Sequence, residues 1–294
     1  FVEPGDEQTR WMGPASNGVS LLSLKDKPCL ILLGDVDMGK STVVEGETKR
    51  LKDLLAGDKH SVRYCDLKRT HESQIVPKIF GDPVVQGWTE GEYPLTLFLD
   101  SLDECWRRVD ELESILVGEL ESLDLKNKPP LFLRLVCRSA EWRGEVGEDL
   151  ERLFPFEEGN NKDRVYLLAP LSKENVRSAA DMVGQTGDRL VREVEQKRVE
   201  ALANHPVTFR MLLDEFLKGA GLPATRCQLY ENGCVELCKD VRAKSGEKRL
   251  RKTTPDQRMV TAGRIAASGV LTNRLLINRE LENRSDREDV LNVA

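Results

Sequence analysis

The alternation of apolar and polar positions along the chain marks five short apolar segments. Most of them are nearly continuous apolar runs bounded by glycine, proline or charged residues, a pattern typical of strands buried on both faces of a sheet. The second segment is β-branched and alternates at its start. The predicted strands are residues 29–33, 61–67, 95–100, 131–138 and 164–171.

Helical periodicity occupies several of the intervals between these strands. Residues 41–56 place Val44, Leu51 and Leu55 on one stripe, and residues 106–123 keep apolar positions at helical spacing. Strands that alternate with helices require crossover connections. We therefore expect an α/β fold with a mainly parallel five-stranded sheet flanked by helices.

The strand signal stops after Pro170. Ser172 is a candidate N-cap for a helix that follows, and two more helical stretches lie on either side of Pro206. Helical patterns continue towards residue 294. This part of the chain is expected to be a helical lid followed by further helices.

Composition narrows the classes of protein that fit. Charged residues make up 32% of the 294 residues and are mixed in sign, with a net charge of -6, which argues against a strongly basic nucleic-acid binder. No apolar stretch approaches the roughly 18–20 residues needed to span a bilayer. The odd count of seven cysteines argues against a disulfide framework and favours a reducing cytoplasm. Because the chain begins at Phe1, we expect it to be part of a longer protein.

The segment GDVDMGKS directly follows the first predicted strand and fits the pattern G-x-x-x-x-G-K-[ST]. Gly34 permits a tight departure from the strand, and Gly39 lets backbone N–H groups approach a phosphate. Lys40 is expected to reach the β- and γ-phosphates, and Ser41 to supply a hydroxyl to Mg²⁺. The predicted nucleotide-binding residues of this loop are Gly34, Asp35, Val36, Asp37, Met38, Gly39, Lys40, Ser41 and Thr42.

The segment LTLFLDSLDE is the second chemical element. Asp100 ends an apolar strand and is expected to join the Mg²⁺ shell as a Walker B acid. Glu104 is our first choice, and Asp103 our second, for the acid that orients the attacking water. An alternative is that these two acids merely favour the start of the helix predicted at Trp106.

The fourth predicted strand ends at Arg138. In a parallel sheet its end lies at the same edge as Gly34 and Asp100, where ligands bind, so Arg138 could respond to a γ-phosphate. The alternative is a surface arginine that pairs with Glu141.

Taken together, these motifs and the segments CRSAEW, YLLAPLSKENV and HPVTFRML resemble the STAND class of signal-transducing NTPases, which includes NACHT proteins. The resemblance covers about residues 27–217 well. It implies an ATP- or ADP-binding switch with Mg²⁺ that exchanges nucleotide and oligomerises on activation, commonly in bacterial antiphage defence. It also implies an effector and a sensor outside this segment, and an activating ligand.

The resemblance assigns further roles by position. It makes Arg138 a sensor arginine and Pro206 the lid proline that packs against adenine. Ser101 and Val136 depart from the family pattern, in which glycine and a threonine or serine are frequent, and no histidine in the last part of the chain matches a winged-helix phosphate sensor.

We therefore predict a lead-in segment (1–26), a P-loop nucleotide-binding domain (27–171), a helical lid (172–225) and a C-terminal helical region (226–294). The resemblance implies that a winged-helix domain could start in this last region. The expected function is a slowly hydrolysing ATPase switch in bacterial immune signalling.

Two alternatives remain. One is an AAA+-type motor or DNA-associated loader, for which Arg143 and Arg152 are candidate arginine fingers. The other is a nucleotide-dependent scaffold that does not hydrolyse ATP, against which the intact Asp103–Glu104 pair argues.

Overall fold

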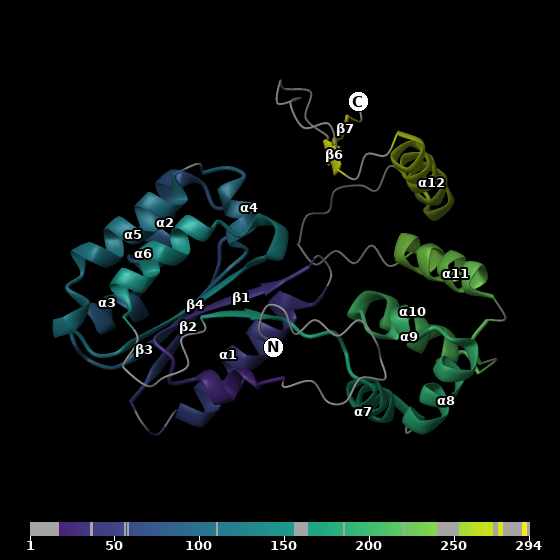
Figure 1. Cartoon of the computed structure of the whole chain (residues 1–294), viewed down its shortest axis with the longest axis horizontal. Helices are drawn as coiled ribbons and strands as arrows, with labels where there is room; N and C mark the ends of the chain where they lie inside the picture. Colours follow the sequence, from purple (N-terminus) through teal and green to yellow (C-terminus); the bar gives the residue numbers. More distant parts are fainter. Residues whose placement is uncertain are drawn as a thin grey trace. The chain divides into compact units, whose positions relative to one another are not determined.

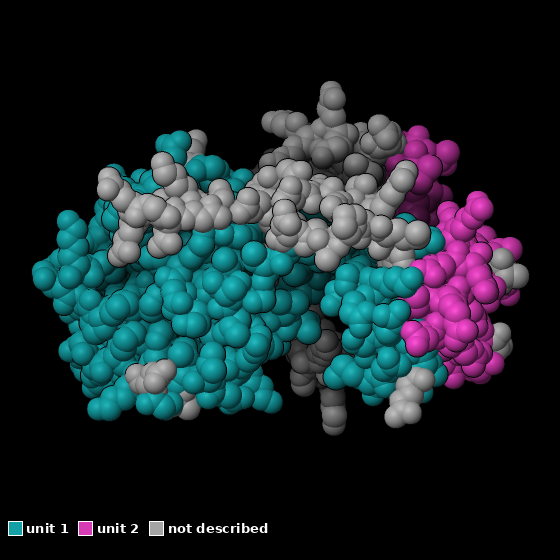
Figure 2. All heavy atoms as spheres, turned by 60° about the horizontal axis from the view of Figure 1, so that its bottom comes forward, with its two compact units in different colours: residues 1–187, 200–209 teal, residues 188–199, 210–294 magenta. Residues whose placement is uncertain are grey.

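The chain divides into two compact units, which Figure 2 colours separately. Unit 1 comprises residues 1–187 and 200–209, and unit 2 comprises residues 188–199 and 210–294. The computed structural model describes residues 18–35, 38–55, 57, 59–109, 111–155, 164–184, 186–219, 221–223, 225–239, 253–272, 276–278 and 290–292.

Unit 1 contains the strands of one sheet and most of the helices. Its elements are η1 (Leu21–Leu24), β1 (Cys29–Gly34), α1 (Lys40–Leu55), β2 (Ser61–Asp66), α2 (Glu72–Ile79), α3 (Pro83–Thr89), β3 (Leu95–Asp100), α4 (Leu102–Trp106), α5 (Leu112–Ser122), η2 (Leu125–Asn127), β4 (Leu131–Arg138), η3 (Ser139–Glu141), α6 (Gly144–Leu153), β5 (Val165–Leu167), α7 (Lys173–Gly184) and α9 (Glu200–Ala203).

Unit 2 is mainly helical. It contains most of α8 (Gly187–Lys197), all but the start of α10 (Pro206–Leu217), then α11 (Arg226–Lys239), α12 (Pro255–Thr272) and a small parallel pair, β6 (Leu276–Asn278) and β7 (Val290–Asn292). Among the helices described in either unit, none has both the length and the apolar character required to cross a membrane.

The sheet of unit 1 has the strand order β2-β3-β4-β1-β5, and every pairing in it is parallel. The predicted α/β fold with a five-stranded parallel sheet is therefore confirmed. Successive side chains of a strand point to opposite sides of the sheet, so each strand contributes apolar residues to both faces. One face packs on η1 and α1, and the other packs on α2 to α6 (Figure 1).

The boundaries of several predicted elements are corrected by the structure. The helix predicted over residues 106–123 is wrong at its start, because α4 ends at Trp106 and α5 begins only at Leu112. Val109 is buried in the turn between these helices. An apolar residue at this position continues the helical spacing of apolar residues in the sequence, although the chain is not helical there. The last strand is shorter than predicted, since it pairs only with β1 at the sheet edge.

Two helices between β2 and β3 have no counterpart in the prediction. Helix α2 follows the loop after β2, and α3 begins behind Asp82, whose side chain accepts a hydrogen bond from the Val84 N–H. The predicted N-cap at Ser172 is confirmed, because its hydroxyl oxygen accepts from the Asn175 N–H at 3.1 Å.

Strand β4 carries a buried cation in its centre. Arg134 is 2% exposed, and its guanidinium donates to the carbonyl oxygens of Lys25 (2.7 Å), Lys27 (2.7 Å) and Leu24 (3.3 Å). Burial lowers the pKa of Arg134 to about 10, so it remains charged at neutral pH. The charge is satisfied by the carbonyls that follow η1, and it attaches the lead-in segment to the sheet.

Replacing Arg134 with alanine should therefore destabilise unit 1. We expect a loss of about 3 kcal/mol, because buried carbonyl oxygens lose charge-assisted hydrogen bonds. Arg152→Ala is the control: that side chain is 64% exposed in its pairs with Glu121 and Asp149, so its loss should cost less than about 1 kcal/mol. Amide hydrogen exchange of β1 and β4 measures both effects. Equal protection in the two variants would contradict the role given to Arg134.

Candidate functional site

The carboxyl ends of β1, β3 and β4 meet at one edge of the sheet. Gly34 at the end of β1 is in register with Arg138 at the end of β4, and Asp100 ends β3 on the other side of β4. The position of β4 between the two other strands thus puts Arg138 between the glycine-rich loop and the acids. Ligands of open parallel sheets bind at this edge.

A hollow of about 260 Å³ lies at this edge. The structure brings most of the predicted site residues into its wall, and adds Lys68 and Ser101. It is lined by Gly39, Lys40, Ser41, Thr42, Lys68, Asp100, Ser101, Asp103, Glu104 and Arg138. The predicted residues Gly34, Asp35 and Met38 lie in the loop behind it, and Val36 and Asp37 lie outside the described residues.

The conformation of the loop depends on its glycines and its lysine. Gly39 has a φ of 77°, a left-handed conformation that favours glycine. The Lys40 Nζ donates to the carbonyl oxygens of Gly34 (2.5 Å) and Asp35 (2.8 Å). Burial lowers the pKa of Lys40, while the nearby Asp103 carboxylate acts in the opposite direction. The ammonium is thus partly withdrawn from water beside the loop, where an anion would bind it strongly.

Asp100 is held by two donors at the floor of the hollow. Its carboxylate accepts from the Ser101 N–H at 2.7 Å on Oδ1 and from the Tyr64 hydroxyl at 2.8 Å on Oδ2. Burial, followed by the hydrogen bond to Asp100, raises the pKa of Tyr64 far above its ordinary value of 10.0. The phenol therefore remains a donor to this carboxylate.

One network of ion pairs at this edge joins Asp103, Glu104, Arg138 and Lys68. Arg138 Nε lies 2.7 Å from Asp103 Oδ2, and Arg138 Nη2 lies 3.5 Å from Glu104 Oε1. Lys68 Nζ lies 3.4 Å from the same Glu104 oxygen. Burial raises the pKa of Asp103, and Arg138 opposes that shift. Each acid therefore has a cation beside it in this structure.

The alternative pairing of Arg138 with Glu141 is wrong, because Glu141 pairs with Arg107 at 2.9 Å. Lys68 and Tyr64 were missed by the sequence reasoning. Lys68 follows the second predicted strand, so the rule that ligands bind at the carboxyl edge could have found it. Nothing in the sequence pattern indicates Tyr64, because its contact with Asp100 depends on β2 lying beside β3.

The start of α10 lies against the loop within unit 1. Pro206 Cγ is 3.8 Å from the position that a Cβ on Gly39 would occupy, and His205 Nδ1 is 3.1 Å from the Met38 sulfur. Pro206 is also the first residue of α10, where its missing N–H is tolerated. The predicted lid proline thus lies close to the loop, although it does not line the hollow.

The oxygen donors around the hollow suit Mg²⁺. The Ser41 hydroxyl and the Asp100 carboxylate line it, and Asp103 Oδ2 is buried without a hydrogen bond from the described residues, since its contact with Arg138 is an ion pair only. No group of three or more His, Cys, Asp or Glu side chains arranged to hold a metal ion by themselves occurs in the part of the chain that the structure describes. Mg²⁺ typically takes one or two protein carboxylates and completes its shell with water and phosphate, so this set fits.

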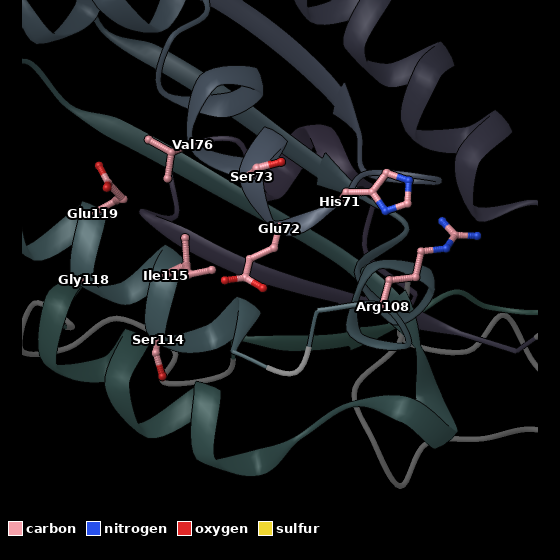
Figure 3. Close-up of a pocket in the computed structure, with 9 residues that line it drawn as sticks. All are labelled: His71, Glu72, Ser73, Val76, Arg108, Ser114, Ile115, Gly118 and Glu119. Atoms are coloured by element: carbon pink, nitrogen blue, oxygen red, sulfur yellow. The ribbon is translucent and has the colours of Figure 1, made fainter. Parts of the chain in front are cut away.

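A second hollow of about 780 Å³ lies between α2 and α5, away from the loop. Figure 3 shows His71 and Arg108 at one end of it and Val76 and Glu119 at the other. Its lining mixes charges of both signs with apolar side chains and includes no residue of the glycine-rich loop. These lining residues do not form a recognisable catalytic arrangement.

No protein-family model matches the sequence. No curated protein matches it either. Solved structures that align with this chain include the ORC2 protein of Aeropyrum pernix in an ADP form, with 12% identity, a TM-score of 0.42, and coverage of 85% of this chain and 83% of that chain.

Two more solved structures belong to this comparison. Domain III of the replication initiation protein DnaA from Thermotoga maritima has 12% identity and a TM-score of 0.42 over 82% of this chain and 98% of that chain. The Walker-type ATPase PABY2304 of Pyrococcus abyssi has 11% identity and a TM-score of 0.42 over 86% and 74%. Alignments this weak carry no conclusion about this chain. In the structure itself, β1 leads through the segment GDVDMGKS into α1 within a parallel sheet, an arrangement typical of P-loop NTPases.

Ser101 adopts a left-handed conformation, with a φ of 65° and a ψ of 37°. Its carbonyl accepts from the Glu104 and Cys105 N–H groups, so the turn starts α4 and aims the acids, while its side chain makes no capping hydrogen bond. A side chain in this region costs roughly 1–2 kcal/mol, a strain that glycine avoids. Serine at this position thus has an energetic cost.

Ser101→Gly should stabilise unit 1 by about 0.5–1 kcal/mol, after subtraction of the greater unfolded-state entropy of glycine. Ser101→Ala is the matched control, because it removes the same hydroxyl and keeps the Cβ, and it should change stability little. Urea unfolding of the three proteins measures the difference. A Ser101→Gly protein no more stable than Ser101→Ala would show that the turn is not strained.

Proposed function

We propose that this chain is an ATP-binding and slowly hydrolysing molecular switch that resembles STAND proteins. One observation carries the proposal: a phosphate-binding loop, a buried acid, two further acids and an arginine converge on one hollow of about 260 Å³. Such a set serves phosphoryl transfer to water, which needs mainly positioning and charge stabilisation.

The loop would hold the phosphates through its N–H groups and through Lys40. The lysine ammonium donates to the carbonyl oxygens of Gly34 and Asp35, which hold it near the start of α1. Phosphate oxygens are stronger acceptors than neutral carbonyls, so the ammonium would turn to them when nucleotide enters. Ser41 and Asp100 would hold Mg²⁺, which when bound neutralises charge on the β- and γ-phosphates.

Glu104 is proposed to orient and deprotonate the attacking water. It is less buried than Asp103, with side-chain exposures of 23% and 4%, so water reaches it more easily. Arg138 and Lys68 both contact the same oxygen of Glu104. A γ-phosphate would compete for these two cations, and their movement would leave Glu104 available to water. Asp103, which Arg138 contacts through Nε, would keep the guanidinium at this edge while its Nη2 turns from Glu104 to the phosphate.

The switch would operate through the start of the lid. Pro206 lies beside Gly39, and His205 Nδ1 is 3.1 Å from the Met38 sulfur, so a change in the loop on nucleotide exchange would shift the first turn of α10. A ligand shifts such an equilibrium by its differential contacts with the two states. In line with the resemblance, we propose cytoplasmic location, an activating ligand, self-oligomerisation on activation, and effector and sensor domains outside this segment, in bacterial immune signalling.

The second candidate is an AAA+-type motor or DNA-associated loader. Arg143 favours it: this side chain is 44% exposed, and among the described residues its partners are Glu113, in a 3.5 Å ion pair, and the Trp106 ring. A nucleotide bound to a neighbouring subunit could recruit it. Arg152 pairs with Glu121 at 2.6 Å. The same chemistry at the hollow serves both candidates.

Turnover distinguishes these two functions. Nucleotide retained through purification would be identified by chromatography, and ATP hydrolysis would be measured with and without DNA. Tightly retained ADP with negligible basal turnover supports the switch. Brisk turnover that DNA stimulates would favour the motor or loader, and Arg143→Ala should then reduce it.

Lys40→Ala should lower nucleotide affinity roughly 10- to 100-fold, because it removes a charge-assisted contact to phosphate. Lys49→Ala is the matched control: it lies on the same helix, is exposed, and has no ion pair among the described residues. Isothermal titration with ATP and ADP measures both. Unchanged affinity in Lys40→Ala would refute the phosphate-binding role of the loop.

Glu104→Gln should retain nucleotide and lose turnover by roughly 10² to 10⁴, the usual contribution of a general base. Asp103→Asn tests the second choice for that role and should reduce turnover less. Single-turnover hydrolysis at saturating ATP gives the chemical step for each variant. If Asp103→Asn loses more than Glu104→Gln, the roles of the two acids are reversed.

A further inference from the structure

Tyr64 contacts the metal-binding acid from a neighbouring strand. Its hydroxyl donates to Asp100 Oδ2 at 2.8 Å, while the Ser101 N–H donates to Oδ1 at 2.7 Å. Each carboxylate oxygen thus has one donor beside it and one lone pair left over. A carboxylate fixed through both oxygens has lost the freedom to rotate.

The register of the sheet explains this contact. Strands β2 and β3 are parallel neighbours, with Asp66 opposite Asp100 and Tyr64 opposite Phe98. Tyr64 is therefore two residues before the partner of Asp100, and side chains two apart on a strand share a face. The tyrosine is long enough to reach forward along that face to the end of the next strand.

The ring of Tyr64 is only partly buried. It lies at the margin of the core that contains Phe98 and Val44, and it also lines an open hollow of about 320 Å³ beside Lys49 and Lys52. Asp100, by contrast, is 2% exposed. A half-buried ring contributes less to packing than a core side chain, so the more specific contribution of Tyr64 is the hydrogen bond of its hydroxyl.

We propose that Tyr64 is a positioning residue for Mg²⁺: it holds Asp100 in the rotamer that directs the remaining lone pairs towards Ser41 and the phosphates. The inference rests on the proposed function, since it concerns the metal that accompanies the nucleotide. Removing a residue that hydrogen-bonds and orients a metal-binding side chain typically lowers metal affinity or activity 10- to 100-fold.

The test is Tyr64→Phe, which removes the hydroxyl and keeps the ring. Tyr93→Phe is the matched control, because the Tyr93 hydroxyl also donates a hydrogen bond, to the Val84 carbonyl at 3.0 Å, and does not contact the site acids. Binding of a fluorescent ATP analogue is measured in EDTA and across a Mg²⁺ titration. Electron paramagnetic resonance of Mn²⁺ counts bound metal directly, independently of turnover.

We expect Tyr64→Phe to bind the analogue in EDTA within about twofold of the wild type, and to require roughly 10- to 100-fold more Mg²⁺ for tight binding. Tyr93→Phe should follow the wild type in both. In an Asp100→Asn background, Tyr64→Phe should change the Mg²⁺ requirement no further, because the two groups act as one unit.

Three results would overturn the inference, and they differ from one another. An unchanged Mg²⁺ requirement in Tyr64→Phe refutes it and leaves the proposed function intact. An equal loss of affinity in EDTA shows a structural role for the hydroxyl instead. A wild-type protein that binds no nucleotide at all refutes the proposed function, and the inference with it. If Tyr64→Phe fails to fold, two other variants replace it in the Mg²⁺ titration and in the Asp100→Asn background. Tyr64→Trp keeps a hydrogen-bond donor on an aromatic ring, and Tyr64→Leu does not. Tyr64→Trp should then retain more metal affinity than Tyr64→Leu.

Discussion

The place of β4 between β1 and β3 is the constraint on which the site depends. Because these strands are parallel and in register, their ends meet at one edge, and the residue that ends β4 lies between the glycine-rich loop and the acids. Arg138 occupies that place and reaches Asp103 and Glu104. Any shift of β4 by one residue would turn the Arg138 side chain to the opposite face.

Cations and acids are equal in number around the hollow. Lys40, Lys68 and Arg138 line it together with the acids Asp100, Asp103 and Glu104. Charges that leave water are costly unless they are paired, so the presence of both signs offsets the cost of gathering these groups. A nucleotide with Mg²⁺ would add charges of both signs. Its phosphates could replace the acids beside the cations, and Mg²⁺ could replace the cations beside the acids, so every charged group would keep a neighbour of opposite charge. Such an exchange is a physical basis for two states.

Strand β4 carries two arginines that illustrate different uses of one side chain. Arg134, in the middle of the strand, is buried and held by backbone carbonyls of the residues before β1, where it fixes the lead-in segment. Arg138, at the carboxyl end of the strand, is partly exposed and paired with carboxylates. Carbonyl partners stay in place when the surroundings change, whereas an ion pair at a hollow can be exchanged for a ligand. The environment, and not the residue type, thus separates the structural cation from the candidate functional one.

The sequence by itself determined the strands, the fold class and most of the candidate site, because continuous apolar runs and the loop GDVDMGKS are local signals. It also indicated Asp100 and Arg138, since both end such runs. It could not determine that β2 lies beside β3, and therefore it missed the contact from Tyr64 to Asp100.

Likewise, only the tertiary structure decided the partners of Arg138. The sequence offered Glu141, three residues away, but packing gave that acid to Arg107 and brought Asp103 and Glu104 to Arg138. The helix break between Trp106 and Leu112 was hidden for a similar reason, because the buried Val109 keeps the apolar period through a turn. Local patterns fix which residues are buried and where strands end, whereas pairings between distant segments depend on strand order, which is a property of the folded chain.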